Sequence, residues 1–258
     1  MAALLTCETD PLTGKTTLAL VSDSELFTAS FTQYSEFLKE NEVVKTGPDA
    51  EMVNRLGNKI SAAAQKWYVK IGKPNYLNDY QWEYHLVKDD QVNAWCLPGG
   101  KIVVYTGILP VTKNEDALAT VMGHEVAHAL LNHGRQRVSV AFLENLGLAA
   151  AGLTAAALGA NETTQSLLMT ALGVGSTLFG TLPFSRENES EADEYGLYLM
   201  AIAGYDPEES VPFWGRMAAG SGSTPEFLST HPSPSTRIDN LKKLIPKAKA
   251  KAIEINGK

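Results

Sequence analysis

Hydrophobic residues recur at helical spacing along several stretches of the chain. Over 48–69 they stand three or four positions apart, as on the buried face of an amphipathic helix. The same spacing continues without interruption from Asn114, a residue type that caps helix starts well. Ser22 and Glu25 have capping-box spacing and open a predicted helix that ends near Glu40. Three more helices are predicted over 185–204, 207–219 and 235–247.

Three shorter stretches have the character of β-strands. Residues 80–87 are rich in aromatic side chains and alternate, and 92–97 and 101–106 are joined by a Pro-Gly-Gly turn. We therefore predict an α+β fold, mostly helical, with a small mixed β-sheet beside the helix that begins at Asn114. No repeat or linker divides the chain, which predicts one domain over 23–258 after a short N-terminal segment.

Composition and charge limit the partners of the chain. Of 258 residues, 44% are hydrophobic and 20% charged, which excludes wholesale disorder. The 29 Asp and Glu exceed the 22 Lys and Arg, giving a net charge of −7, and no basic patch compensates, so nucleic acid is not expected as a partner. Two cysteines, Cys7 and Cys96, are too few for a disulfide framework or a cysteine-based metal site.

The sequence predicts no membrane-spanning helix, because no run of about 18 uncharged apolar residues occurs. The nearest candidate, 146–184, is rich in Ala, Gly and Leu and is interrupted by the polar block 161–165, so we expect packed helices there, and the alternative is an element that touches the membrane. Residues 4–7 resemble the end of a bacterial lipoprotein signal, although Thr6 departs from the usual Gly, Ala or Ser. We therefore expect a removed export signal and peripheral membrane attachment through a lipid on Cys7.

The helix that begins at Asn114 carries the motif HExxH. His124 and His128 are four apart, so both imidazoles project from one helix face and can reach a single zinc ion. Glu125 lies beside that face, where it can hold a water whose pKa zinc lowers and take its proton. The alternative is a structural histidine pair on a helix.

A catalytic zinc needs a third protein ligand. The extended motif HExxHxxGxxH is excluded, because Leu131 and Gly134 stand at its Gly and His positions. His133 lies about 140° around the helix from His128, so we expect it at the surface or in the helix's last turn.

The acidic stretch 186–193 offers better candidates. Glu189 and Asp193 share a helix face, whereas Glu191 points about 200° from Glu189. One face can then supply a zinc ligand, Glu189, and an acid, Asp193, that accepts the second N–H of a ligating histidine. The alternative is a solvated acidic helix start.

Three segments together resemble a known family. HEVAH at 124–128, the Arg-containing ExExAD-type segment 186–193 and the HP…R element 231–237 are similar to the HtpX/Oma-like and CAAX-prenyl-protease family of zinc metallopeptidases, and within it to soluble or lipoprotein members of the bacterial cell envelope. The resemblance covers nearly the whole chain. Further segments that resemble the family are 11–15, 93–95, 98–100 and 105–107.

This resemblance implies a gluzincin-type fold and peptide hydrolysis. It implies one zinc ion per chain held by His124, His128 and Glu189, with Glu125 as general base and Asp193 as the acid behind a ligand. It also implies action on unfolded, misfolded or membrane-associated proteins, and it places the chain in the periplasm or at the periplasmic side of the outer membrane.

Two further elements are assigned from the HP…R element and from the strands. Amide hydrolysis develops an oxyanion that needs a donor besides the metal, and His231 and Arg237 are candidates for that catalytic role. His231 could instead occupy the open coordination position of zinc and so keep the enzyme latent. The alternative to both roles is a structural loop before the last helix. We also expect strand 101–105, or the strand 93–97 beside it, to border the substrate cleft, and the alternative is that both are ordinary strands of the core sheet.

The sequence thus favours an envelope zinc endopeptidase that degrades misfolded or unassembled proteins. The alternative is a non-proteolytic binding or assembly factor that uses the zinc fold as a docking groove, which would have no need of Glu125. A prenyl-protein protease is disfavoured, because such relatives span the membrane many times. We expect segment 146–181, which separates the two halves of the metal site, to cover the site in a latent state.

Overall fold

The computed structural model describes residues 7–140, 184–219, 226–231 and 236–257. Its helices are α1 Asp23–Glu40, α2 Pro48–Lys70, α3 Leu109–Thr112, α4 Glu115–Leu130, α7 Arg186–Ile202, α8 Ser210–Ala218, α9 Glu226–Thr230 and α10 Arg237–Asn256. Its strands are β1 Cys7–Thr9, β2 Thr16–Leu18, β3 Val43–Val44, β4 Glu83–Val87, β5 Ala94–Leu97 and β6 Lys101–Tyr105. Residues 133–140 are also helical. Segment 146–181, the expected cover, lies outside the described residues.

Four strands form a mixed sheet in the order β3-β4-β6-β5. Strand β6 runs parallel to β4 and antiparallel to β5, with Val104 opposite Ala94 and Val103 opposite Trp95. Strand β5 is therefore an edge strand, and no other described strand pairs with its outer side. The predicted α+β fold with a small mixed sheet is confirmed.

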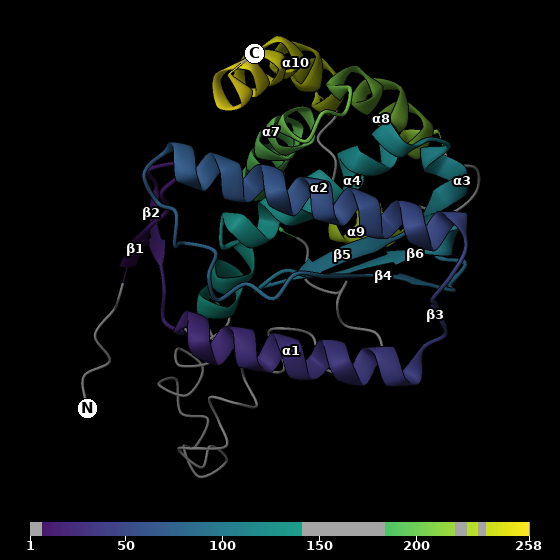
Figure 1. Ribbon diagram of the computed structural model, residues 1–258, viewed down its shortest axis with the longest axis horizontal. Helices are drawn as coiled ribbons and strands as arrows, with labels where there is room; N and C mark the ends of the chain where they lie inside the picture. The colour runs from purple at the N-terminus through teal and green to yellow at the C-terminus, as the bar shows by residue number, and fades with distance from the viewer. Residues whose placement is uncertain (1–6, 141–183, 220–225, 232–235, 258) are drawn as a thin grey trace, which may run out of the picture.

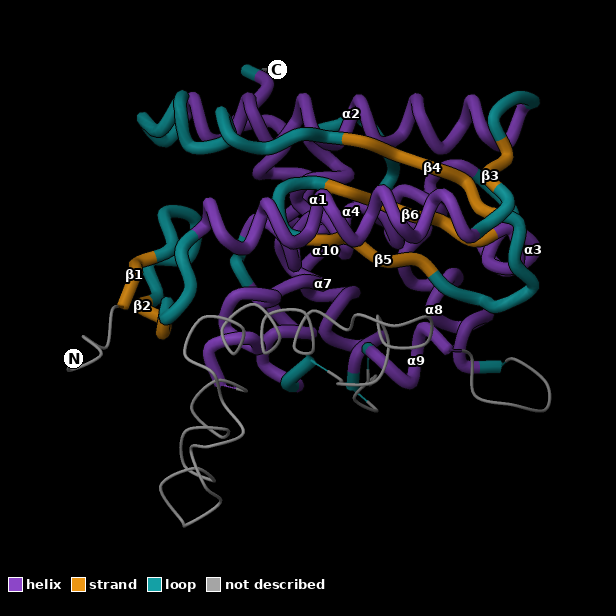
Figure 2. Tube along the Cα trace, turned by 90° about the horizontal axis from the view of Figure 1, so that it is seen from below, coloured by secondary structure: helices purple, strands orange, loops and turns teal. Residues whose placement is uncertain are grey.

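Both faces of the sheet are covered by helices. Ile102 and Val104 of β6 pack into the main core with α2, α4 and α7, whereas Val103 and Tyr105 belong to a second cluster under α1. Figure 1 shows α1 along one side of the sheet and α2 along the other, with α7, α8 and α10 beyond α4. Seen from below in Figure 2, α1 lies over the strands. Because both faces are buried, β6 is buried at every position.

Helices α4 and α7 cross with almost no side chain between them. A Cβ built on Gly196 of α7 would lie 2.8 Å from the backbone nitrogen of His124, and one built on Gly123 would lie 2.7 Å from the carbonyl oxygen of Gly196. Such a close approach of two backbones requires glycine at both positions. This crossing brings the start of α7 alongside the HExxH turns of α4.

The predicted helix starts are confirmed, with the capping box at Ser22 and Glu25 and the N-caps at Asn114 and Ser185. The last helix is longer than predicted and continues past Pro246 to Asn256, because good helix formers fill its end. The short elements β1, β2, β3, α3 and α9 were not predicted, since two to five residues carry no readable period. No helix within the described residues is long and apolar enough to cross a membrane.

Strands β1 and β2 form an antiparallel hairpin within the predicted N-terminal segment. The side chain of Asp10 accepts hydrogen bonds from the backbone N–H groups of Leu12 and Thr13 and shapes the turn. Tyr195 of α7 donates its hydroxyl to the carbonyl oxygen of Leu12 at 3.2 Å. The hairpin is thus docked against α7, while the division of the chain at residue 22 stays a prediction.

Candidate metal centre and active site

Helix α4 places its two motif histidines in the core of the protein. Asn114 starts the helix by accepting the N–H of Ala117 at 2.8 Å, and every residue from Ala117 to Leu130 is buried. The Nε2 atoms of His124 and His128 lie 3.0 Å apart, and each side chain is 2% exposed. The predicted sharing of one helix face therefore brings two imidazole nitrogens to one point.

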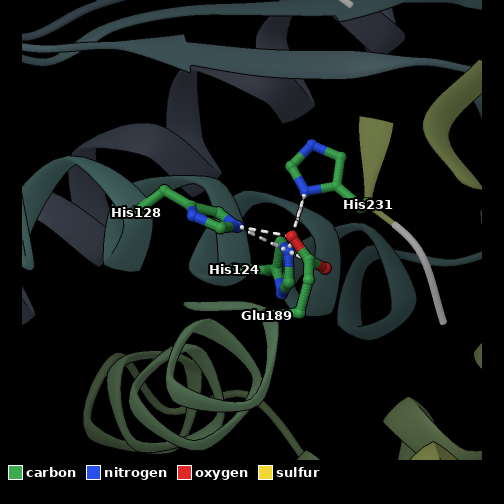
Figure 3. Close-up of side chains that lie close together, drawn as sticks. All are labelled: His124, His128, Glu189 and His231. Atoms are coloured by element: carbon green, nitrogen blue, oxygen red, sulfur yellow. Dashed lines mark hydrogen bonds and ion pairs between the residues drawn. The ribbon is translucent and has the colours of Figure 1, made fainter. Parts of the chain in front are cut away.

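Glu189, from the first turns of α7, completes the convergence. Its carboxylate is fully buried, with Oε1 3.3 Å from Nε2 of His128 and Oε2 3.5 Å from Nε2 of His124. Together with His231, these three residues form a buried group of four: His124, His128, Glu189 and His231. One possible ligand atom from each residue lies within 4.8 Å of those of the others (Figure 3). Imidazole nitrogens and a carboxylate oxygen are the ligands that zinc takes, so this donor set fits one zinc ion.

The charges at this point favour a bound cation. Burial alone would lower the pKa of His124, but the carboxylates of Glu189 and Asp193 outweigh it and raise that pKa to about 9. Burial would raise the pKa of Glu189, yet the His124 charge and hydrogen bonds from imidazoles hold it well below its usual range. Burial also keeps the pKa of His128 well below its usual value. The buried carboxylates of Glu189 and Asp193 thus favour positive charge at this point, which a metal ion would supply.

Glu125 lies next to the converging nitrogens but outside the group of four. It is 2% exposed, and its Oε1 lies 3.4 Å from Nε2 of His231 with no hydrogen-bond partner among the described residues. Burial raises its pKa, against the opposing effect of the imidazoles of His231 and His124. A carboxylate with a raised pKa is suited to proton transfer near neutral pH.

A pocket opens beside Glu125 and is bordered by the edge of the sheet. Strand β5 and the turn after it line one side, and His128, Phe184 and His231 line the metal side. Of the two strands expected at the cleft, β5 contributes Trp95, Cys96 and Leu97 to the lining of this pocket, while Lys101–Tyr105 lies inside the sheet between β4 and β5. Substrate binding along this edge stays a prediction.

Asp193 and Arg237 form a charged network behind the ligands. Oδ1 of Asp193 lies 3.0 Å from Nδ1 of His124. Arg237 donates its Nε–H to Asp193 at 2.6 Å and its Nη2–H to Glu189 at 2.7 Å, and its guanidinium lies over the Trp214 ring. Asp193 is therefore placed as expected, but Arg237 is bound to two carboxylates, which differs from the position expected of an oxyanion donor.

His231 follows α9 and enters the metal group. Its Nδ1 lies 2.9 Å from Oε1 of Glu189 and 3.3 Å from Nε2 of His124, and its ring stacks on Phe227. His231 therefore lies close enough to the other three residues to contact a metal ion held by them, and its two expected roles, at the metal or at the oxyanion, stay predictions.

His133 is not at the surface, and that expectation was wrong. It is fully buried, with Nδ1 2.9 Å from Nδ1 of His128 and Nε2 3.2 Å from Oε2 of Glu191. The angle of 140° assumes one continuous helix, but α4 ends at Leu130 and the backbone turns at Asn132, whose φ is +56°. The following helical stretch therefore brings His133 back toward His128, and no periodicity in the sequence signals this turn.

The chain is similar to known metallopeptidases. Its residues 55–245 match the model of peptidase family M48. It is 38% identical over 179 residues to the mitochondrial metalloendopeptidase OMA1 of Schizosaccharomyces pombe, which covers 68% of this chain and 50% of that protein. With the mitochondrial metalloendopeptidase OMA1 of Homo sapiens it shares 30% identity over 256 residues, 93% of this chain and 46% of the relative.

A bacterial relative is more distant. The β-barrel assembly-enhancing protease of Escherichia coli O157:H7 is 29% identical over 170 residues, 64% of this chain and 35% of that protein. The chain thus spans about half the length or less of these curated relatives.

Proposed function

This chain belongs to peptidase family M48, and from that premise we propose that it is a zinc-dependent metalloendopeptidase. The observation that carries the proposal is the buried convergence of His124, His128 and Glu189 beside Glu125. A bound zinc would lower the pKa of a water molecule and polarise the peptide carbonyl. A protein that only docks partners would have no use for a buried carboxylate next to three metal ligands.

Each residue of the site has a distinct role in this proposal. His124, His128 and Glu189 hold the metal, and Glu125 acts as general base, taking the proton of the attacking water and passing it to the leaving amine. Asp193 accepts the Nδ1–H of His124 and so fixes its tautomer, as outer partners of zinc ligands do. Arg237 holds Asp193 and Glu189 in position by donating a hydrogen bond to each. We propose this positioning role for Arg237 in place of the oxyanion role that the sequence predicted.

His231 keeps the enzyme latent in this proposal. A catalytic zinc needs a fourth position open to water. Nδ1 of His231 lies 2.9 Å from Oε1 of Glu189 and within reach of the other donors, which supports His231 as the occupant of that position. If His231 blocks the position, His231→Ala raises basal cleavage. If it serves the oxyanion instead, the same variant lowers cleavage.

The substrate is proposed to be an unfolded or misfolded protein bound in an extended conformation. The outer edge of β5 borders the pocket beside Glu125, and backbone hydrogen bonds to such an edge are indifferent to side-chain sequence. Action on misfolded or unassembled envelope proteins is the finer form of this proposal. Its support is the similarity to a bacterial protease named for β-barrel assembly.

The place of the protein in the cell stays a prediction. Two of the relatives described are mitochondrial by name and one is bacterial, so the similarity is compatible with more than one compartment. Cys7 is exposed at the start of β1, which leaves its thiol accessible for the predicted lipid.

The experiment is cleavage of casein by the zinc-loaded protein, with Glu125→Gln as the matched variant. Glutamine keeps the size of the side chain but cannot take a proton. Cleavage by the wild type and none by the variant supports the proposal. Equal cleavage by both refutes the role of Glu125. Zinc binding without cleavage by either protein, and without cleavage by the His231→Ala variant, favours the docking factor.

A further inference from the structure

Each α4 histidine of the site has two ring nitrogens. When Nε2 binds the metal, Nδ1 is left in the core and needs a hydrogen-bond partner there. For His124 this nitrogen faces Asp193, a carboxylate. For His128 it faces another imidazole, with 2.9 Å between Nδ1 of His128 and Nδ1 of His133. The distance is that of a good hydrogen bond, and both rings are buried.

Metal binding fixes the direction of the hydrogen bonds at His128. If Nε2 of His128 binds the metal, its Nδ1 carries the hydrogen and donates to Nδ1 of His133. His133 must then carry its own hydrogen on Nε2, which lies 3.2 Å from Oε2 of Glu191 and donates to that carboxylate. Neutral His133 thus satisfies both contacts in a single tautomer.

The line of contacts continues to the N-terminal hairpin. The other oxygen of Glu191, Oε1, pairs with Nζ of Lys15, which also pairs with Glu187 at 2.6 Å. Lys15 closes the hairpin turn, where its carbonyl oxygen accepts the N–H of Asp10 at 2.9 Å. The ammonium of Lys15 therefore has a defined position relative to α7.

We propose that His133 is a positioning residue for zinc: it fixes the tautomer and ring orientation of His128 and ties that ligand, through Glu191, to Lys15 of the hairpin. The proposal rests on the proposed function, since it concerns the same metal. The two histidines are then held in position in a similar way. Each is connected by hydrogen bonds to a carboxylate, and that carboxylate forms an ion pair with a cationic side chain. His124 reaches Arg237 through Asp193, and His128 reaches Lys15 through His133 and Glu191.

The test measures zinc affinity by competition with a chromophoric chelator and records the absorption spectrum of the cobalt-substituted protein. His133→Leu removes both hydrogen bonds, and we expect it to weaken zinc binding by about 10- to 100-fold and to shift the cobalt spectrum. His133→Gln can accept from His128 through its amide oxygen and donate to Glu191 through its amide nitrogen. We expect this variant to restore most of the affinity.

A second pair of variants tests the hairpin and does not depend on the fold of the core. Lys15→Met should weaken zinc binding by about two- to fivefold, the scale of an exposed ion pair. The matched control is Lys88→Met, which removes an exposed pair with Glu42 far along the chain from the site and should leave zinc affinity unchanged. Near-ultraviolet circular dichroism of the metal-free proteins reports whether each variant keeps its packing.

The outcomes separate this inference from the proposed function. Wild-type zinc affinity and cobalt spectrum in His133→Leu overturn the role of His133, even if the enzyme cleaves casein. If His133→Gln binds zinc as weakly as His133→Leu, the role of His133 is also overturned, because restoring the hydrogen bonds would then not restore the zinc affinity. Zinc affinity that depends on His133, in a protein that cleaves no casein even as the His231→Ala variant, supports the inference and refutes the proposed function.

Discussion

The crossing of α4 and α7 sets the separation of the proposed metal ligands, and Gly196→Ala tests this directly. Glu189 stands seven residues before Gly196, close to two helical turns, so both lie on the face of α7 that meets α4. A displacement at Gly196 is therefore carried to the Glu189 carboxylate.

The structure gives the size of that displacement. The new Cβ would lie 2.8 Å from the His124 nitrogen, whereas ordinary contact begins at 3.4 Å, so the helices must separate by about 0.6 Å. Zinc–ligand distances tolerate about 0.2 Å. We expect zinc affinity to fall by at least about tenfold, and the overpacking to lower the free energy of unfolding by about 1–3 kcal/mol.

The assay pairs chelator competition with urea unfolding of the metal-free protein. Gly215→Ala in α8 is the matched control, because nothing lies within 4 Å of its added Cβ and alanine favours a helix by up to about 1 kcal/mol. The two variants should change stability in opposite directions, and only Gly196→Ala should affect zinc. Wild-type zinc affinity in Gly196→Ala would refute the reasoning.

Three further predictions concern the charged groups and the metal. Arg237→Met should lower the free energy of unfolding by about 3–5 kcal/mol in urea titrations, because Glu189 and Asp193 lose a buried partner; a loss below 1 kcal/mol contradicts this. Zinc at 100 times its dissociation constant should stabilise the fold by about 2.7 kcal/mol, seen as a drop in melting temperature on chelation, and an unchanged melting temperature contradicts a structural contribution of the metal. Burial raises the pKa of Asp10 above 3.8, so the folded state favours the protonated side chain. The stabilisation from protonated Asp10 is complete below pH 3.8 and is lost as pH rises through the raised pKa. Asp10→Asn keeps the turn-forming oxygen and should gain stability relative to wild type between pH 3.5 and pH 7, and an equal difference in urea unfolding at both pH values would exclude this titration.

Local interactions are the part of this protein that could be predicted from its sequence. A spacing of four residues puts His124 and His128 on one face in any α-helix, and a capping side chain bonds to its own first turn. The same rule placed Glu189 and Asp193 on one face of α7. Their contact with α4 was inferred from the donor chemistry that zinc requires, together with the resemblance to a family, rather than from periodicity.

Tertiary structure alone decided which groups support these residues. His133 lies beyond the end of α4, where a left-handed residue at Asn132 changes the direction of the chain, so helical angles no longer apply. Arg237 and Lys15 reach the acids of α7 from elements more than forty residues away along the chain. Such contacts depend on how elements pack, and packing is set by surfaces such as the Gly123–Gly196 crossing, which no local pattern records. The sequence thus determines the proposed ligands and the helices that carry them, and the tertiary structure determines the groups that hold them in place.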